Sequence, residues 1–301
     1  MIPGFALPLL IVMQTRAASV PPRPVAWAVQ SPRPAVCLAA PGLWEVSRQA
    51  LVERRCRELS RAQALLQRAP EQALSRAAAL LQQAPELIEA RVLRGRASLR
   101  VGRADGALAD LLPLLAEGTG PVADPAALQD GGRAALLSNQ LEVAARFYRK
   151  LGSSAALLPD RAQQAVAYIE IAGTLLASPT PNVDEVLAYL REARRRSAGS
   201  GFTSLTVALT ALAFIAEGRE AEGQGALSEL SDVWSLERFE KPQEVWLPSG
   251  VFHAMLGLAL ERVRSELSAD HYRQVAASTL GATAIGKVGT RRRDPGKRGG
   301  R

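Results

Sequence analysis

Hydrophobic positions recur at helical spacing through most of the chain. Between residues 51 and 67, leucines follow one another at combinations of three- and four-residue steps, the spacing that places side chains on one face of an α-helix. Pro70 ends this predicted helix and can begin the next, because proline is tolerated in a first helical turn. The pattern therefore predicts paired helices that begin near Trp44.

Small residues mark a longer period within this helical region. Ala73, Ala107 and Ala144 follow one another at offsets of 34 and 37 residues, and Gly95 and Gly132 each lie 12 residues before the last two of these alanines. Self-similarity at this period is typical of stacked helical hairpins. Small side chains at the crossing points allow paired helices to approach closely, so the sequence predicts an array of hairpins.

The segment Glu86–Gly118 resembles a tetratricopeptide repeat. Gly95 stands at the small position where the two helices of that repeat cross, and Gly102 stands in the turn seven residues later. Ala107-x3-Leu111 matches the Ala-x3-Phe pair of the second helix, with an aliphatic residue in place of the aromatic one.

Residues 125–152 repeat the scheme with Gly132 at the crossing, Asn139 in the turn and Ala144-x3-Tyr148 on the second helix. The offset of 37 residues between these two units fits a longer connecting loop.

Later segments show weaker copies of the same unit. One covers residues 160–197, with Asp160 as the predicted N-cap. Another carries Ala211, Gly218 and Gly223 at spacings of 7 and 12 residues from the first. The resemblance implies an all-α fold: a right-handed α-solenoid of helix-turn-helix repeats over residues 44–280, with disordered termini.

A solenoid of this kind implies a binding role rather than a catalytic one. Its concave groove, lined by the first helix of each hairpin, would hold a peptide or a partner helix. We therefore predict a non-enzymatic scaffold for protein–protein interaction. The predicted groove positions are Arg96, Arg100, Arg133 and Tyr168.

The N-terminus predicts export. Residues 4–13 are an apolar run, too short to span a bilayer but suitable for the core of a signal peptide. We interpret residues 1–20 as a signal peptide, with membrane contact confined to it, and residues 21–43 as a proline-rich linker. This predicts an exported or periplasmic protein, with a cytoplasmic one as the alternative.

The chain has two cysteines, Cys37 and Cys56. They are too few for a zinc site and could form one disulfide if the protein is exported. Because Cys37 lies in the proline-rich segment and Cys56 on a predicted helix, we interpret them as unpaired thiols.

Most of the net charge of +8 lies in a short C-terminal tail. Residues 287–301 carry seven basic residues against Asp294, a net charge of +6. We interpret residues 281–301 as a basic disordered tail. The alternative function is therefore binding of a nucleic acid or an anionic surface through this tail, while nucleic-acid binding by the folded part is not expected.

Motifs for catalysis or ligand binding are missing from the sequence. Gly281–Lys287 reads GATAIGK, but Val288 stands where a P-loop needs serine or threonine, and the segment follows a predicted helix rather than a strand. The two histidines, His253 and His271, show no metal-ligand spacing. We therefore predict no catalytic residues, no cofactor, no metal site and no small-molecule substrate.

Overall fold

The computed structural model describes residues 46–116, 124–197, 202–230, 245–262 and 266–280, together with positions 283 and 285. The predicted signal peptide and proline-rich linker, and nearly all of the predicted basic tail, lie outside these residues.

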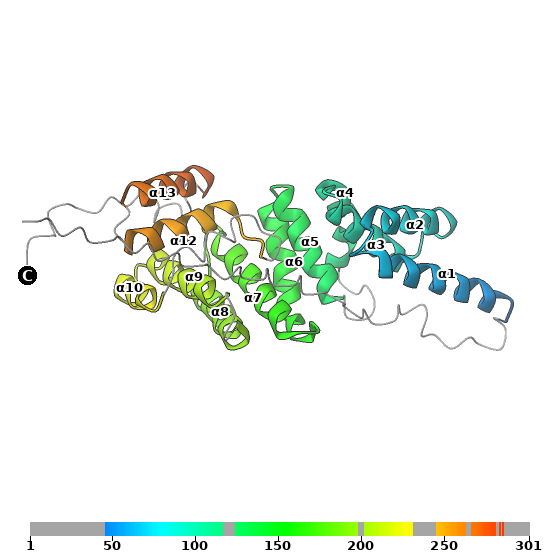
Figure 1. The fold of residues 1–301 in the computed structure, drawn as a ribbon, viewed down its shortest axis with the longest axis horizontal. Coiled ribbons are helices and arrows are strands. Elements are labelled where there is room, and N and C mark those ends of the chain that lie inside the picture. Colours follow the sequence, from blue (N-terminus) through cyan, green and yellow to red (C-terminus); the bar gives the residue numbers. More distant parts are fainter. Residues whose placement is uncertain are drawn as a thin grey trace, which may run out of the picture. The chain divides into compact units, whose positions relative to one another are not determined.

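The described part of the chain consists of helices joined by turns, without a β-strand (Figure 1). The α-helices, in chain order, are α1 (Val46–Leu65), α2 (Pro70–Gln83), α3 (Ile88–Arg100), α4 (Ala104–Leu111), α5 (Pro125–Leu137), α6 (Leu141–Gly152), α7 (Arg161–Leu176), α8 (Val183–Ser197), α9 (Phe202–Ala216), α10 (Glu220–Ser228), α12 (Ser249–Arg262) and α13 (Glu266–Leu280). Two short 3-10 helices follow α4 and α6, at Leu112–Leu115 and Ala155–Leu157.

The helices form a stack of hairpins. Each helix from α1 to α10 packs against the next one in the chain, and α12 packs against α13. The first helices of successive hairpins also contact one another: α1 with α3, α3 with α5, α7 with α9, and α9 with α12. Each hairpin therefore adds one helix to a layer of first helices and one to a layer of second helices. This confirms the predicted all-α array of helical hairpins.

The predicted crossing residues lie where paired helices approach most closely. A Cβ atom on Gly95 of α3 would lie 2.8 Å from Cγ of Leu111 on α4, and one on Gly132 of α5 would lie 2.7 Å from the ring of Tyr148 on α6. Real Cβ atoms do not approach other heavy atoms this closely, so glycine is required at both crossings for packing reasons.

The turns also follow the prediction. Gly102 and Asn139 both have positive φ, at 80° and 54°, a conformation that glycine and asparagine adopt most readily. Asp160 caps α7, because its carboxylate accepts a hydrogen bond of 2.8 Å from the backbone N–H of Gln163. These local signals therefore set the helix boundaries.

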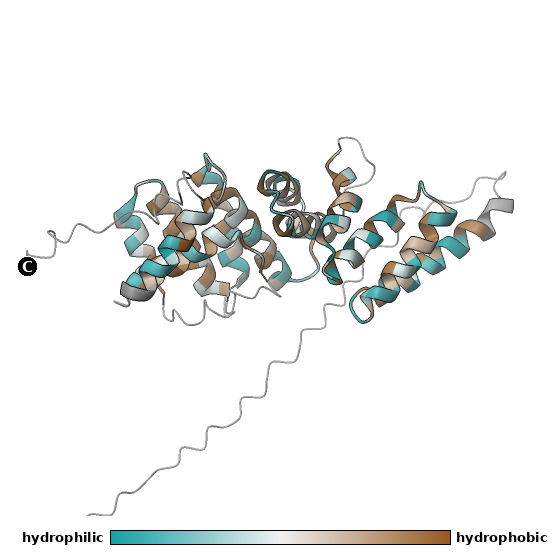
Figure 2. Cartoon of the chain, turned by 90° about the horizontal axis from the view of Figure 1, so that it is seen from above, coloured by the Kyte–Doolittle hydropathy of each residue, from teal (hydrophilic) through white to brown (hydrophobic). Residues whose placement is uncertain are grey.

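Apolar side chains divide into two clusters along the stack. The smaller one joins α1, α2 and most of α3, while the larger one extends from Leu99 to Ile285. Hydrophobic and hydrophilic positions alternate along the helices (Figure 2). In α7, every residue from Ala165 to Leu176 is buried. These twelve residues cover the whole circumference of α7, including the polar Glu170 and Thr174, so the helix is buried inside the larger cluster.

Cys56 on α1 is disulfide-bonded. The interpretation of this residue as an unpaired thiol is therefore wrong. Cys37, the other cysteine of the sequence, lies outside the described residues. A run of consecutive apolar residues long enough to cross a bilayer is not found in any helix that the structure describes.

Candidate functional site

Arginines of α3 bind an acidic group on the next first helix, α5. The Arg96 Nε–H donates to the Asp130 carboxylate at 2.8 Å, and Arg100 Nη1 donates to it at 3.2 Å. Arg96 Nη1 also donates to Asp124, just before α5, at 3.1 Å. The Arg96 and Asp130 side chains are only 6% and 3% exposed. An ion pair this well buried fixes how α3 is placed against α5.

The charges around Asp130 keep it ionised. Burial alone would raise the pKa of this carboxyl, but the charges of Arg100, Arg96 and Arg133 outweigh burial and hold the pKa below its ordinary value. Asp130 therefore remains a carboxylate over the whole neutral range.

A second buried pair joins α5 to α7. Arg133 Nη2 and Nε donate to the Glu170 carboxylate at 2.6 and 3.0 Å, and Gln129 Nε2 donates to it at 2.8 Å. The Tyr148 hydroxyl lies 3.4 Å from the same carboxylate. The Glu170 side chain has no exposed surface. We call the pairs Arg96–Asp130, Arg100–Asp130 and Arg133–Glu170 the ion-pair ladder.

Glu170 differs from Asp130 in its titration. Burial raises the pKa of Glu170 above its ordinary value, although Arg133, Gln129 and the backbone N–H of Trp246 all favour the ionised form. Burial likewise raises the pKa of Tyr148, so that its phenol remains protonated. The Glu170 carboxylate therefore accepts hydrogen bonds from several donors of the chain and is closed to solvent.

One of the donors to Glu170 comes from a distant part of the chain. The segment Val245–Pro248 leads into α12 without regular secondary structure, and the backbone N–H of Trp246 donates to Glu170 Oε1 at 3.0 Å. The Leu247 side chain occupies the space that a side chain at Gly173 would need. The Arg133 guanidinium carbon lies 5.8 Å from the centre of the Trp246 ring.

The segment Val245–Pro248 therefore contacts the first helices α5 and α7. It is the coil that leads into α12 in Figure 1. A backbone N–H, an aromatic ring and an aliphatic side chain of one short segment each contact a different residue of these helices. A bound peptide would use the same groups.

The structure places the four predicted groove positions on first helices: Arg96 and Arg100 on α3, Arg133 on α5 and Tyr168 on α7. It brings the first three into the ion-pair ladder, with Arg96 and Arg100 meeting at Asp130. Their guanidinium groups thus already have partners within the chain. Contact of these side chains with another protein stays a prediction.

Tyr168 lies apart from the ladder. Its ring stacks on Tyr189 of α8, with the two ring centres 6.1 Å apart. The Arg196 guanidinium carbon lies 4.8 Å from the centre of the Tyr168 ring. Only 6% of Tyr168 is exposed. This ring therefore packs α7 against α8.

Sequence reasoning missed Asp130, Glu170 and Trp246. A signal for the two acids exists, because Asp130 follows Arg96 by 34 residues and Glu170 follows Arg133 by 37, the offsets at which the alanines recur. An arginine and an acid one repeat apart can meet between successive first helices. The contact of Trp246 spans 76 residues, and no periodicity in the sequence indicates it.

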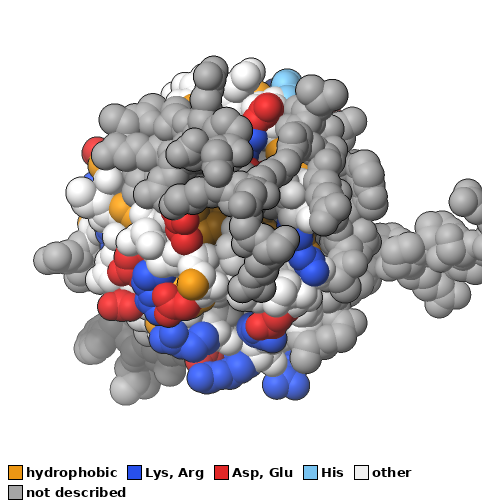
Figure 3. All heavy atoms as spheres, turned by 90° about the vertical axis from the view of Figure 1, so that its left-hand side faces the viewer, with side chains coloured by type: hydrophobic (Ala, Val, Ile, Leu, Met, Phe, Trp, Pro, Cys, Tyr) orange, Lys and Arg blue, Asp and Glu red, His pale blue; other side chains and the backbone are white. Residues whose placement is uncertain are grey.

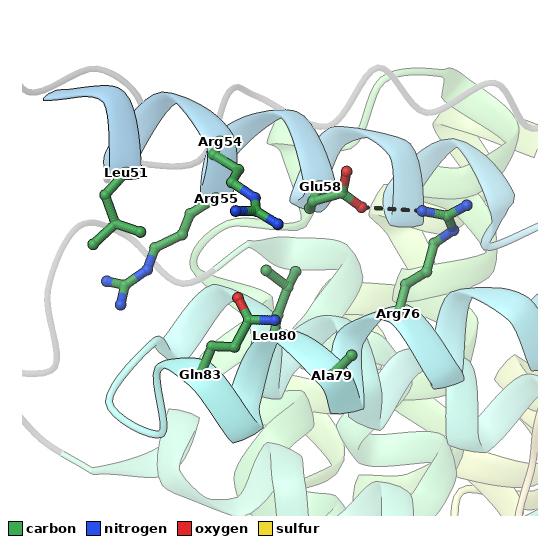
Figure 4. A pocket seen from close by; sticks show the side chains of 8 residues that line it. All are labelled: Leu51, Arg54, Arg55, Glu58, Arg76, Ala79, Leu80 and Gln83. Atoms are coloured by element: carbon green, nitrogen blue, oxygen red, sulfur yellow. Dashed lines mark hydrogen bonds and ion pairs between the residues drawn. The ribbon is translucent and has the colours of Figure 1, made fainter.

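The structure also has a hollow between α1 and α2, with a volume of about 340 Å³ (Figure 4). It is lined by Leu51, Arg54, Arg55, Glu58, Arg76, Ala79, Leu80 and Gln83. Three arginines face it with one glutamate, and Glu58 pairs with Arg76 at 3.0 Å. We call this site the α1–α2 hollow.

A second hollow of about 310 Å³ lies between α8, α9 and α10. Its charged residues include Arg194 and Glu229, which pair with each other at 2.6 Å. Charges of both signs also intermingle on the face of the molecule near α10 and α13 (Figure 3). The third charged residue of this hollow, Glu222, pairs with Arg219, so each charged residue that lines the hollow has an ionic partner within the chain.

No cluster of three or more metal-ligating side chains occurs among the described residues.

No protein-family model matches the sequence, and no curated protein matches it. Among solved structures, the assembly chaperone of RpL4 (Acl4, residues 1–338) is similar with a TM-score of 0.45 and 18% identity, covering 78% of this chain and 94% of that one. A likeness of this strength carries no inference about function.

Proposed function

We propose that this protein is a non-enzymatic scaffold that holds an extended segment of a protein partner along its first helices. One observation carries the proposal: the chain's own segment Val245–Pro248 already lies on α5 and α7, with its backbone bound by Glu170. Solenoids use the face made by successive helices to bind extended chains in this way.

The ion-pair ladder supports a binding role for this layer. It uses charged side chains to fix the spacing between α3, α5 and α7, and a binding face needs such preorganisation because ordering it on binding would reduce affinity. The buried carboxylate of Glu170 has its hydrogen-bonding capacity filled by donors of the chain itself. It is thus suited to hold a backbone in place and not to exchange protons with a substrate.

The same layer leaves positions accessible next to the ladder. Val92, Arg96 and Arg100 follow at four-residue steps on α3, so they share one face of the helix. Val92 and Arg100 are partly exposed, and Leu137, four residues after Arg133 on α5, is 51% exposed. An apolar and cationic surface is therefore available to a partner segment beside the occupied part of the layer.

The proposal can be tested by site-specific photo-crosslinking in the native host. A photoreactive amino acid is placed at Val92 or Leu137 on the first helices, with Glu142 on α6 and Arg191 on α8 as matched exposed positions on second helices. We expect the two first-helix positions to crosslink the same partner protein, and the second-helix positions to crosslink it at least about tenfold less. Equal crosslinking from both layers would contradict the proposal.

The basic tail supplies the control for the alternative function. Residues 287–301 carry a net charge of +6, and electrostatic binding of an anionic polymer weakens steeply with added salt. A chain ending at residue 286 should give the same crosslinks if the scaffold proposal is right. Loss of the partner on this truncation would favour the nucleic-acid or anionic-surface alternative instead.

A further inference from the structure

We propose that the α1–α2 hollow is a second binding site, which takes carboxylate side chains of an acidic peptide segment from a protein partner. Arg54 and Arg55 of α1 and Arg76 of α2 line the hollow with a single acid, Glu58. This site lies outside the ion-pair ladder and does not depend on the segment Val245–Pro248.

The two arginines of α1 have hydrogen-bond donors to spare. In the described part of the chain, Arg54 has no hydrogen bond or ion pair, and the buried Nε–H of Arg55 has no acceptor. The one ion pair of Arg55, with Glu86, is long at 3.5 Å, and the Glu86 side chain is 72% exposed. A buried hydrogen-bond donor without an acceptor is unfavourable. An incoming carboxylate would supply the missing acceptor.

Arg76, by contrast, is held in place. Its Nη1 donates to Glu58 across the hollow at 3.0 Å, and Arg61 holds the other oxygen of Glu58 at 2.6 Å, as the labelled side chains in Figure 4 show in part. The hydrogen bond and the charge of Arg61 lower the pKa of Glu58. One wall of the hollow is therefore fixed by ion pairs, while the wall formed by Arg54 is free to receive a ligand.

The size and the lining fit a peptide side chain. A volume of about 340 Å³ lies at the small end of the range for ligand pockets. Leu51, which is 47% exposed, and Ala79 and Leu80 provide apolar surface beside the arginines, and Gln83 offers an amide to a peptide backbone. A carboxylate flanked by an aliphatic residue would use both kinds of surface.

The chemistry favours a foreign peptide over other anions. Residues 1–44 contain no aspartate or glutamate, so the predicted proline-rich linker, residues 21–43, cannot supply the carboxylate. Leu51, Ala79 and Leu80 in the lining give apolar surface that the side chains of a peptide can cover and an inorganic phosphate cannot. Nucleic-acid binding by phosphate contacts needs a row of basic groups along a surface, whereas these arginines surround one hollow.

The probe is a fluorescent, end-capped peptide of eight residues in which glutamate and leucine alternate, titrated into the full chain at low salt. Its matched control peptide has glutamine in place of glutamate. Two protein variants carry the same loss of charge: R54Q/R55Q in the hollow, and R57Q/R68Q on the same helix and the turn that follows it, outside the lining. The single variant R54Q accompanies them, because Arg54 is exposed and unpaired, so its replacement leaves the fold intact.

We expect the glutamate peptide to bind at least about tenfold more tightly than the glutamine peptide, and R54Q/R55Q to lose about tenfold in affinity, since charge-assisted hydrogen bonds to arginine are of that strength. R54Q should lose about threefold, and R57Q/R68Q less than about twofold. Absence of binding, equal binding of both peptides, equal losses in the two double variants, or tighter binding of inorganic phosphate or a single-stranded oligonucleotide would each overturn the proposal.

Discussion

The first helices α3, α5 and α7 and the first helices α9 and α12 occupy equivalent places in their hairpins, but they are joined by different forces. The earlier set is connected by the ion-pair ladder, with Asp130 and Glu170 almost completely buried. The later set is connected by apolar contacts, and α9 contains no charged residue at all. One architecture therefore tolerates two kinds of interface between repeats.

The two kinds of interface contribute differently to the placement of the helices and to the stability of the fold. Apolar burial stabilises a fold in proportion to area and has little directional preference. A buried ion pair adds little net stability over an apolar pair, but breaking it is costly because one charge remains buried alone. The ladder therefore fixes the spacing of the layer that we propose as the binding face, while α9 and α12 belong to the apolar core.

The largest loss of stability is expected at Glu170, the acid of the ion-pair ladder that lies on α7. Glu170→Ala should lower the free energy of unfolding by about 3–5 kcal/mol, because the Arg133 guanidinium remains buried without its counter-charge. The measurement is urea unfolding followed by circular dichroism. The double variant R133M/E170L should recover most of the loss, and a cost below about 1 kcal/mol for E170A would show that the ladder is not what joins α5 to α7.

Truncating a buried side chain on α9 should lower the free energy of unfolding slightly less. Leu209 on α9 is completely buried, and Leu209→Ala should lower the free energy of unfolding by about 3 kcal/mol through lost burial and the cavity left behind. Leu137→Ala, at a position that is 51% exposed, should cost less than about 1 kcal/mol in the same urea titration. Similar losses at both sites would mean that α9 is not packed as described.

The ladder should also respond to acid. The folded state lowers the pKa of Asp130 below its ordinary value of 3.8, so the stability that its ionised form contributes is complete above about pH 4 and is lost as the pH falls through the lowered pKa. Unfolding midpoints of the wild type and of Asp130→Asn should therefore differ by the same amount at pH 7 and pH 5, and the difference should shrink as the pH is lowered below 3.8. A difference that stays constant over this range of pH would show that the ionised form of Asp130 does not stabilise the folded state.

The smallest effect is expected for an ion pair on the surface. Arg195 and Glu192 pair on α8, with 68% and 32% of their side chains exposed. Arg195→Ala should change the free energy of unfolding by less than about 0.5 kcal/mol. A loss as large as that of Glu170→Ala would mean that burial is not what distinguishes the ladder from other ion pairs.

Much of the fold could be predicted because its signals are local or periodic. Gly95 and Gly132 mark helix crossings by their small size, and Gly102, Asn139 and Asp160 mark turns and a cap by backbone preferences that do not depend on distant residues. These preferences act over a few residues, so the sequence displays them directly.

The site was less predictable because its contacts are made by the folded stack. The arginines of α3 were expected to contact a partner, but Arg96 turns inward to Asp130 because the next first helix brings an acid opposite it. Only pairing residues one repeat apart would have shown this. The hydrogen bond from Trp246 to Glu170 joins residues 76 positions apart, and no local preference of either residue indicates it.

The most direct test of the account is the hydrogen exchange of a single amide. The N–H of Trp246 belongs to no helix, and its hydrogen-bond acceptor in the structure is the fully buried Glu170. If the segment Val245–Pro248 lies on α5 and α7 as a bound peptide would, this amide should exchange about as slowly as the amides of those helices. Exchange at the rate of an unstructured peptide would contradict the claim that this layer of helices holds an extended chain.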